Sequence, residues 1–234
     1  SQVAACARRA EVAVIVGTDH QAERARVTLT LQHYATPFGT MPTERSLVEA
    51  LAEPFGPEAF AEELHHRNEH SIELALVWLQ HMRRGQPLPL LPVLCGSFHR
   101  YLEQRRSPAE DDTLMAAIAS LRERLAGRRA LIVAAGDLAH SGPAFGDGPQ
   151  GPQQRTLGRT ADEALVGAIC RGDAEGFWAQ IAAEGDRRHV CGAGPIYLAL
   201  RLLEPVRGEP AGYLQAPADA QGASFVSVAG VALL

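Results

Sequence analysis

The chain has 234 residues, of which 46% are hydrophobic and 21% charged, and its formal net charge is −5. This composition is typical of one soluble globular domain. The dispersed basic residues argue against a nucleic-acid surface, and no apolar run approaches the roughly 20 residues that a membrane span needs. The cysteines Cys6, Cys95, Cys170 and Cys191 form no CxxC pair, which excludes a zinc ribbon and predicts a reducing, cytoplasmic location.

The first predicted strand is the apolar run Val12–Gly17, which Asp19 and His20 follow. A short apolar run that ends at a glycine is typical of a strand buried on both faces of a parallel sheet. Ligands bind at the carboxyl ends of such strands. Asp19 and His20 are therefore candidate site residues.

Residues 27–33 alternate between apolar and polar side chains, which predicts a half-buried strand. Helices are predicted over residues 43–52 and 57–66, with Gly56 and Pro57 between them. His65 and His66 would then lie at the solvated end of the second helix.

A further helix begins near Glu69 and His70 and ends at Gly85. Its apolar residues follow the spacing of a buried stripe, namely Ile72, Ala75, Leu76 and Leu79. At the helix N-terminus Glu69 is favoured by the helix dipole, and His70 should stay neutral and able to accept a proton or bind a ligand. The alternative is that both residues only cap the helix.

The next strand, residues 88–94, ends at Cys95, which we interpret as a core residue. Asp111 and Asp112 open a helix that ends at Gly127 and buries Leu114, Ile118, Leu121 and Leu125. With the strand that follows, these elements form a βαβ unit, whose crossover should be right-handed.

Ala130–Ala135 is an uninterrupted apolar run, and Asp137 and His140 lie just beyond its end. A carboxylate and an imidazole at the carboxyl end of a buried strand are candidates for chemistry. Alternatively, Asp137 caps the turn and His140 is an ordinary loop histidine. The segment 141–154 is rich in glycine and proline and is predicted to cover this pocket.

Helices are predicted over residues 157–171, 174–184 and 196–203, and a last strand over 224–233, beside the others in the sheet. Cys191 lies just ahead of the third helix. A helix N-terminus lowers the pKa of a thiol and favours the thiolate, the form that binds metals.

Six ordered segments together resemble the Memo family, which is called AmmeMemoRadiSam system protein B in prokaryotes. The matching segments are Gly17–His20, Thr36–Gly39, Glu69–Glu73, Leu91–Leu94, Asp137 with His140, and Cys191–Ile196. The resemblance implies a single α/β domain over residues 1–234. Its central sheet would be mostly parallel or mixed with helices on both faces, similar in fold to the class III extradiol dioxygenases.

The resemblance also implies a site. His20 and Cys191 stand where the family has metal ligands, and Asp137, His140, Glu69 and His70 stand where it has pocket residues. Imidazole and thiolate ligands suit iron, copper or zinc far better than magnesium or calcium, and the resemblance to dioxygenases favours iron. Asp137 would orient a histidine, and His140 or His70 would transfer protons in a dioxygenase-like reaction.

The chain also departs from the family pattern. The family has an upstream H-x-G-Y motif whose histidine is a third ligand, and no histidine precedes His20 here. We expect either that the N-terminal segment of the family is missing from this chain or that the site has one ligand fewer. Asp19 replaces the serine of the family's first motif and is a candidate substitute ligand.

Three functions follow as expectations. The first is a Memo-like metal-binding protein with a radical SAM enzyme or an AMMECR1-like protein as partner, as the family name implies. The second is a non-heme iron oxygenase of the extradiol type. The third is a metal-free descendant that keeps the fold for protein interaction. The sequence holds no P-loop, HExxH or GxSxG motif, which argues against nucleotide binding, a metalloprotease and a serine hydrolase.

Overall fold

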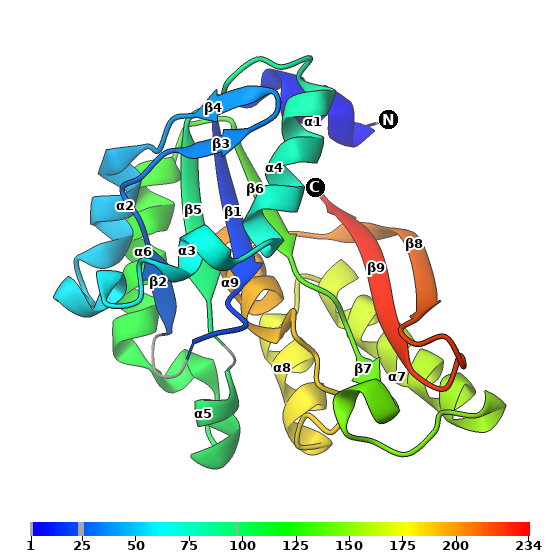
Figure 1. The fold of residues 1–234 in the computed structure, drawn as a ribbon. Helices are drawn as coiled ribbons and strands as arrows, with labels where there is room; N and C mark the ends of the chain where they lie inside the picture. Colours follow the sequence, from blue (N-terminus) through cyan, green and yellow to red (C-terminus); the bar gives the residue numbers. More distant parts are fainter. Residues whose placement is uncertain (1, 23–25, 97) are drawn as a thin grey trace.

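A four-stranded mixed sheet forms the centre of the computed structural model, which describes residues 2–22, 26–96 and 98–234 (Figure 1). Its strands are β1 (Val12–Thr18), β2 (Val27–Leu29), β5 (Leu90–Cys95) and β6 (Ala130–Ala135), in the order β2-β5-β1-β6. β1 pairs in parallel with β5 and β6, and β2 pairs antiparallel with β5. The predicted α/β class is confirmed.

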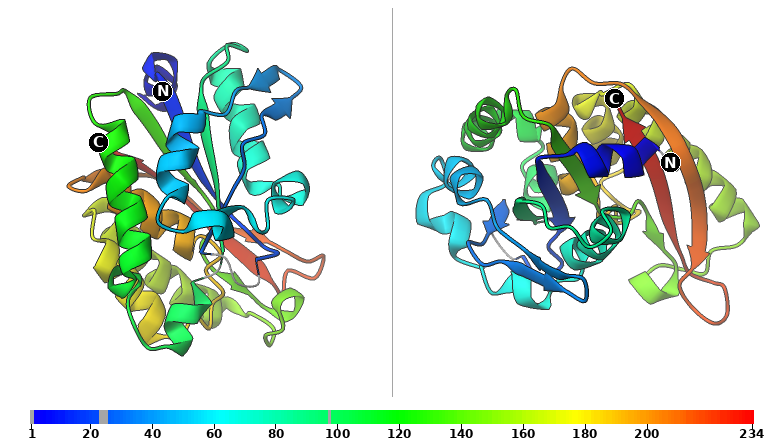
Figure 2. Two further views of the ribbon diagram at one scale, coloured as in Figure 1. Left: turned by 90° about the vertical axis from the view of Figure 1, so that its left-hand side faces the viewer. Right: turned by 90° about the horizontal axis from the view of Figure 1, so that it is seen from above.

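Helices cover both faces of this sheet (Figure 2). Val12, Val14 and Val16 of β1 face a core formed with α2 (Arg45–Ala52), α6 (Asp112–Leu125) and α9 (Ala193–Leu203). The alternate residues Ala13 and Ile15 face a second core, formed with α1 (Gln2–Arg9) and α4 (Ser71–Met82). Because successive side chains of a strand point to opposite faces, a wholly apolar β1 requires helices on both sides.

The remaining helical segments lie around this frame. They are the α-helices α3 (His65–Asn68), α5 (His99–Glu103), α7 (Pro152–Cys170) and α8 (Ala174–Ala183), and the 3₁₀ helices Gly56–Phe60, Pro108–Glu110 and Pro143–Phe145. Two aspartates cap helices: the side chain of Asp111 accepts the backbone N–H of Leu114, as its place at the start of the predicted helix indicates, and that of Asp173 accepts the N–H of Gly176. None of the helices in the described ranges is long and apolar enough to cross a bilayer.

The predicted strand over residues 27–33 is shorter than expected. The side chain of Thr30 accepts the backbone N–H of Gln32 and donates to Glu63, and these bonds turn the chain away from the sheet after Leu29. The chain then forms a small hairpin of β3 (Tyr34–Thr36) and β4 (Gly39–Met41).

The helix predicted over residues 57–66 is also wrong in part, because two short helices replace it. His66 is buried rather than solvated: its Nε2 lies 2.9 Å from the carbonyl oxygen of Thr28 and its Nδ1 lies 2.6 Å from the hydroxyl of Tyr34. Burial lowers the pKa of His66. A neutral ring that donates from Nε2 and accepts at Nδ1 satisfies both partners.

The last predicted strand lies in a second sheet instead of the central one. β9 (Phe225–Leu233) pairs antiparallel with β8 (Gly208–Pro217) and with the short β7 (His140–Ser141), in the order β7-β9-β8. The sequence of β8 resembles a loop because it contains Gly208, Pro210 and Gly212, and glycine and proline weaken strand patterns. A register shift between Pro210 and Gly212 accommodates them.

Candidate functional site

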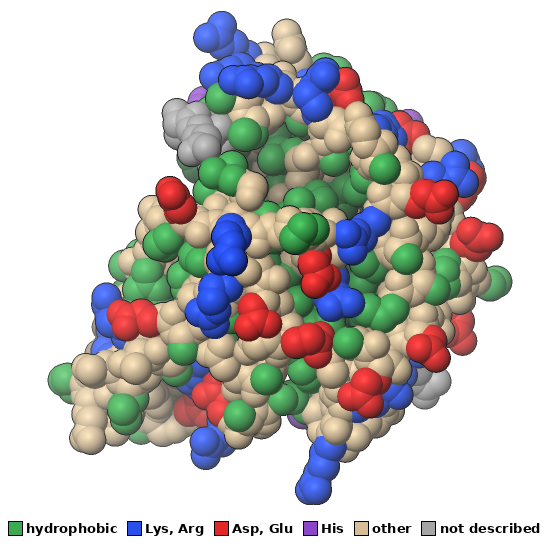
Figure 3. All heavy atoms as spheres, turned by 180° about the vertical axis from the view of Figure 1, so that it is seen from behind, with side chains coloured by type: hydrophobic (Ala, Val, Ile, Leu, Met, Phe, Trp, Pro, Cys, Tyr) green, Lys and Arg blue, Asp and Glu red, His purple; other side chains and the backbone are tan. Residues whose placement is uncertain are grey.

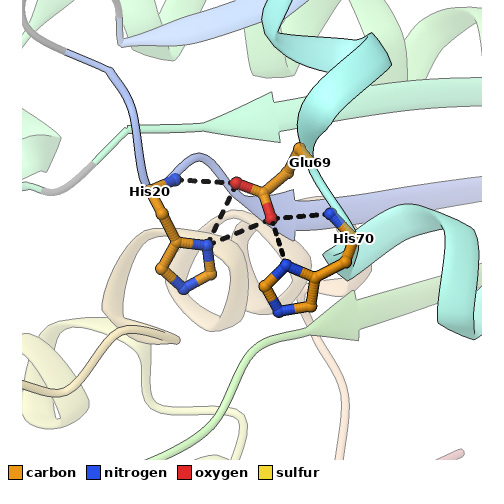
Figure 4. Close-up of side chains that lie close together, drawn as sticks. All are labelled: His20, Glu69 and His70. Carbon is orange, nitrogen blue, oxygen red and sulfur yellow. Dashed lines mark hydrogen bonds and ion pairs between the residues drawn. The ribbon is translucent and has the colours of Figure 1, made fainter.

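Glu69 holds two histidines in place at the carboxyl end of β1 (Figure 4). Its buried carboxylate accepts the backbone N–H of His20 at 2.9 Å and that of His70 at 2.8 Å. The same carboxylate lies 3.0 Å from the Nδ1 of His20 and 3.1 Å from the Nδ1 of His70. The two rings are stacked, with centroids 5.2 Å apart and an interplanar angle of 9°.

This arrangement fixes the tautomer of His20. A carboxylate only accepts hydrogen bonds, so the Nδ1 of the neutral His20 ring carries the proton and its Nε2 keeps a free lone pair. In Figure 4 the Nε2 atoms of His20 and His70 both point away from Glu69. A carboxylate behind a histidine is the usual support of an imidazole metal ligand.

The protonation state of Glu69 agrees with this role. Burial by itself would raise the pKa of the carboxyl group, but the hydrogen bonds donated by His20 and His70 outweigh burial and hold the pKa below its usual value. Glu69 is therefore the negatively charged acceptor that both histidines need.

A glycine brings α4 close enough for this contact. A Cβ atom at Gly17 would lie 2.4 Å from the hydroxyl oxygen of Ser71. That hydroxyl donates to the carbonyl oxygen of Thr18 at 2.9 Å. The start of α4 is thereby fixed to the end of β1, and Glu69 is placed beside His20.

Cys191 is held by the loop after β6 and by Thr18 at the end of β1. Its Sγ accepts the backbone N–H of Asp137 at 3.2 Å, and its carbonyl oxygen accepts the hydroxyl of Thr18 at 3.0 Å. The loops touch without side chains between them, since a Cβ at Gly136 would lie 2.7 Å from the Cα of Gly192. The backbone N–H of Gly192 also donates to the carbonyl oxygen of Asp137 at 2.8 Å.

The expected lowering of the Cys191 pKa is wrong for this structure. Burial is the largest influence and raises the pKa of the thiol to about 11, although the N–H of Asp137 opposes the rise. Cys191 precedes the first residue of α9 by two positions, and its sulfur contacts Asp137 rather than the helix amides. A nearby positive charge is therefore needed before the thiolate forms near neutral pH.

His140 presents a free ring nitrogen toward the same region. Its Nδ1 lies 3.1 Å from the carbonyl oxygen of His189 and 3.3 Å from that of Leu138. Both partners are acceptors, so Nδ1 carries the proton and Nε2, 3.9 Å from an oxygen of Asp137, is free to accept one. The edge of His140 packs against Phe145 of the predicted covering segment, with ring centroids 5.0 Å apart.

A cavity of about 330 Å³ lies beside these residues, and both predicted metal ligands, His20 and Cys191, line it. The other lining residues are Thr18, Asp19, Ala22, Phe98, His99, Leu102, Trp178, Ile181, Asp186, His189, Val190 and Ala193. Among the described residues, Glu69, His70, Asp137 and His140 do not line the cavity. They contact or adjoin His20 and Cys191.

Three groups of side chains have donor atoms within 4.8 Å of one another over the described parts of the chain: His20–Glu69–His70, Asp137–His140–Cys191 and Asp19–Glu62–His65. His20 belongs to the first of these groups and Cys191 to the second, and both residues line the same cavity. Asp19, the candidate substitute ligand, is buried and lies 3.0 Å from the Nδ1 of His65.

Sequence reasoning missed several cavity residues. Trp178 has the pattern of a core residue, yet it lines the cavity and packs edge-on against Phe98, with ring centroids 6.1 Å apart. Asp186 follows the end of α8, and burial raises the pKa of its carboxyl group. No motif marks Asp186, and only its place after Gly185, just beyond the end of α8, could have indicated a loop at the cavity.

Nearly the whole chain matches one known family. The family described as "Memo-like protein" matches residues 2–232 of the chain. The chain belongs to the Memo-like protein family. The resemblance inferred from six motifs is therefore confirmed.

Archaeal and bacterial relatives support the assignment. A MEMO1 family protein of Methanosarcina barkeri is 28% identical over 188 residues, which are 80% of this chain and 61% of that protein. A MEMO1 family protein of Methanosarcina acetivorans is 27% identical over 206 residues, 88% of this chain and 67% of that protein. One from Thermus thermophilus is 27% identical over 195 residues, 83% of this chain and 54% of that protein. The Memo-like chain thus spans about three fifths of the length of such relatives.

Proposed function

We propose that this Memo-like chain binds a redox-active or divalent metal ion through the Nε2 of His20 and the Sγ of Cys191. The observation that carries the proposal is that both residues line one cavity while Glu69 occupies the other nitrogen of His20. The free lone pair of His20 is thereby available to a ligand in the cavity.

The donor set decides which metals fit. An imidazole and a thiolate suit iron, copper or zinc and are poor ligands for magnesium or calcium. We favour iron, with copper and zinc as alternatives. A bound cation would also stabilise the thiolate of Cys191 despite the raised pKa of the free thiol, so binding should release a proton.

A second candidate function is an oxygenase of the extradiol type, in which a redox metal would supply electron transfer to dioxygen. The tautomer of His140 favours it: with Nδ1 donating to two carbonyl oxygens, Nε2 can accept a substrate proton next to Cys191. Asp137 would then stabilise the protonated ring, its carboxylate lying 3.9 Å from that nitrogen.

A metal-free role in protein interaction is the third candidate function. The first candidate, the metal-binding protein, includes a radical SAM enzyme or an AMMECR1-like protein as its partner. All four cysteines are free thiols, which favours the reducing cytoplasm as the working compartment.

The test of the first function is metal content. Protein loaded anaerobically with Fe(II), Zn(II) or Cu(I) and then desalted should retain metal, and His20→Ala or Cys191→Ser should each lower retention at least about tenfold. His81→Ala and Cys170→Ser are matched controls, because neither residue lines the cavity. Unchanged metal content in both site variants would remove the proposal.

The oxygenase is tested separately. Iron-loaded protein should consume dioxygen with a catechol, and His140→Ala should abolish uptake without loss of iron. An iron-loaded protein that binds catechols yet consumes no dioxygen would contradict this second function and leave metal binding intact.

A further inference from the structure

Asp19, Glu62 and His65 form a compact group of side chains that the proposed function does not use. Asp19 directly follows β1, His65 is the first residue of α3, and Glu62 lies in the turn before that helix. The Nδ1 of His65 lies 3.0 Å from an oxygen of Asp19 and 4.0 Å from the Oε2 of Glu62. The donor atoms of the three side chains all lie within 4.8 Å of one another.

This group differs from the charged residues of an ordinary protein surface. On the face seen in Figure 3, acidic and basic side chains are interspersed over the surface. The carboxylate of Asp19 is instead fully buried, and the side chains of Glu62 and His65 are each only 21% exposed. Two carboxylates thus share a largely buried space with one imidazole. Burying a charge is costly unless an opposite charge or hydrogen-bond donors compensate for the lost water.

The carboxylate of Glu62 lacks this compensation. Its Oε2 is buried and forms no hydrogen bond with any residue that the structure describes. Asp19 is better satisfied, because its carboxylate accepts the backbone N–H of Gln21 at 3.0 Å as well as the Nδ1–H of His65. Within the described ranges, no arginine forms an ion pair with Asp19 or Glu62. A bound cation would supply the partner that the Glu62 oxygen is missing.

We propose that Asp19, Glu62 and His65 bind a divalent metal ion of the manganese or zinc class, at a site that shares no ligand with His20 and Cys191. Two carboxylates and one imidazole suit these ions and do not select copper(I). Ligand atoms about 2.1 Å from a tetrahedral zinc ion lie roughly 3.4 Å apart, and the separations of 3.0 and 4.0 Å bracket this spacing. When the ion binds Nδ1 of His65, the proton moves to Nε2 and the ring stays neutral.

The experiment uses manganese(II) as the probe, because its preference for carboxylates separates this site from an imidazole and thiolate pair. Binding is measured at equilibrium by electron paramagnetic resonance, in which the signal of the free ion falls as the ion binds. Equilibrium matters because a site without a thiolate should release its ion readily during desalting. The whole 234-residue chain and its Cys191→Ser variant should each bind about one manganese ion per chain.

Two variants remove a ligand each. His65→Ala and Glu62→Gln should each weaken manganese binding at least about tenfold, whereas the exposed His81→Ala and Glu58→Gln are matched controls and should bind normally. Glu62→Gln also replaces an unpartnered buried carboxylate with a neutral amide. In chelator-treated protein its free energy of unfolding in urea should therefore stay the same or rise. A loss of stability would show that Oε2 already has a partner and would overturn the inference.

Two results of the manganese titration would also overturn the inference. In the first, the ion does not bind, or binds equally well to the original chain and to both ligand variants. In the second, Cys191→Ser abolishes binding, which would assign the ion to the site of His20 and Cys191. That result would leave the proposed function intact and remove only the second site.

Discussion

The two sides of the cavity hold their predicted ligands by different means. His20 is oriented by a side chain, the buried carboxylate of Glu69, which also orients His70. The sulfur of Cys191 is oriented by a backbone group, the N–H of Asp137, while the hydroxyl of Thr18 and the close contact of Gly136 with Gly192 fix its backbone. We therefore expect the His20 side of the cavity to be sensitive to substitutions that change charge, and the Cys191 side to be sensitive to substitutions that change packing.

The largest expected effect concerns the thiol of Cys191. With a pKa of about 11, its thiolate fraction at pH 8 is roughly 200-fold below that of an ordinary cysteine, whose pKa is about 8.5. Chelator-treated protein should react with iodoacetamide correspondingly slowly. The rate, followed by mass spectrometry, should rise about tenfold per pH unit between about pH 8 and 10. A rate that levels off by about pH 9.5, as expected for an ordinary cysteine of pKa about 8.5, would contradict the buried thiol.

The second largest effect is expected from a substitution that changes the packing beside Cys191. In Gly192→Ala the new Cβ would lie 2.5 Å from the carbonyl oxygen of Asp137, so the loops must separate. We expect a loss of about 1–3 kcal/mol in the free energy of unfolding, measured by urea denaturation. The control is Gly148→Ala, where no atom lies within 4 Å of the new Cβ. Equal stability of the two variants would show that the loop contact is not required.

A change of charge on the histidine side should affect binding more than folding. Glu69→Gln keeps the size of the side chain but can no longer act as a charged acceptor for both rings. Metal affinity, measured by competition with a chelator, should fall about ten- to a hundredfold. Glu73→Gln on the exposed face of the same helix should have no effect. An unaltered affinity in Glu69→Gln would mean that His20 is not a ligand through Nε2.

The smallest effect should follow the loss of His70. Its side chain is 67% exposed and does not line the cavity among the described residues. We expect His70→Ala to change metal affinity by less than about fivefold, under 1 kcal/mol. A loss as large as that of His20→Ala in the same competition assay would make the second ring a ligand and would redefine the histidine side.

The sequence indicated the central sheet more reliably than the second one. β1, β5 and β6 are continuous apolar runs because helices cover both faces of their sheet, and such runs are visible without a structure. β8 is largely exposed and interrupted by Gly208, Pro210 and Gly212. Its pattern therefore resembles a loop, and the placement of β9 beside it could not be inferred.

Of the predicted site residues, all of which the structure describes, His20 and Cys191 line the cavity, whereas Glu69, His70, Asp137 and His140 do not. The sequence placed His20 at a strand end and Cys191 just ahead of a helix, and the two residues line one cavity. The sequence could not show that Glu69 contacts two rings at once, because that contact depends on how closely α4 approaches Gly17. The predicted direction of the Cys191 pKa shift was wrong. The prediction considered the position of the thiol ahead of a helix, but the sequence could not show that the thiol is buried.

His140 and Cys191 belong to different structural layers. His140 begins β7, which is hydrogen-bonded to β9 in the smaller sheet, whereas Cys191 leads into α9, which packs on the central sheet. The distance between the imidazole of His140 and the sulfur of Cys191 therefore depends on the angle between the two sheets. A ligand bound by both side chains would therefore connect the two layers. With this ligand bound, the two layers should unfold more cooperatively on heating.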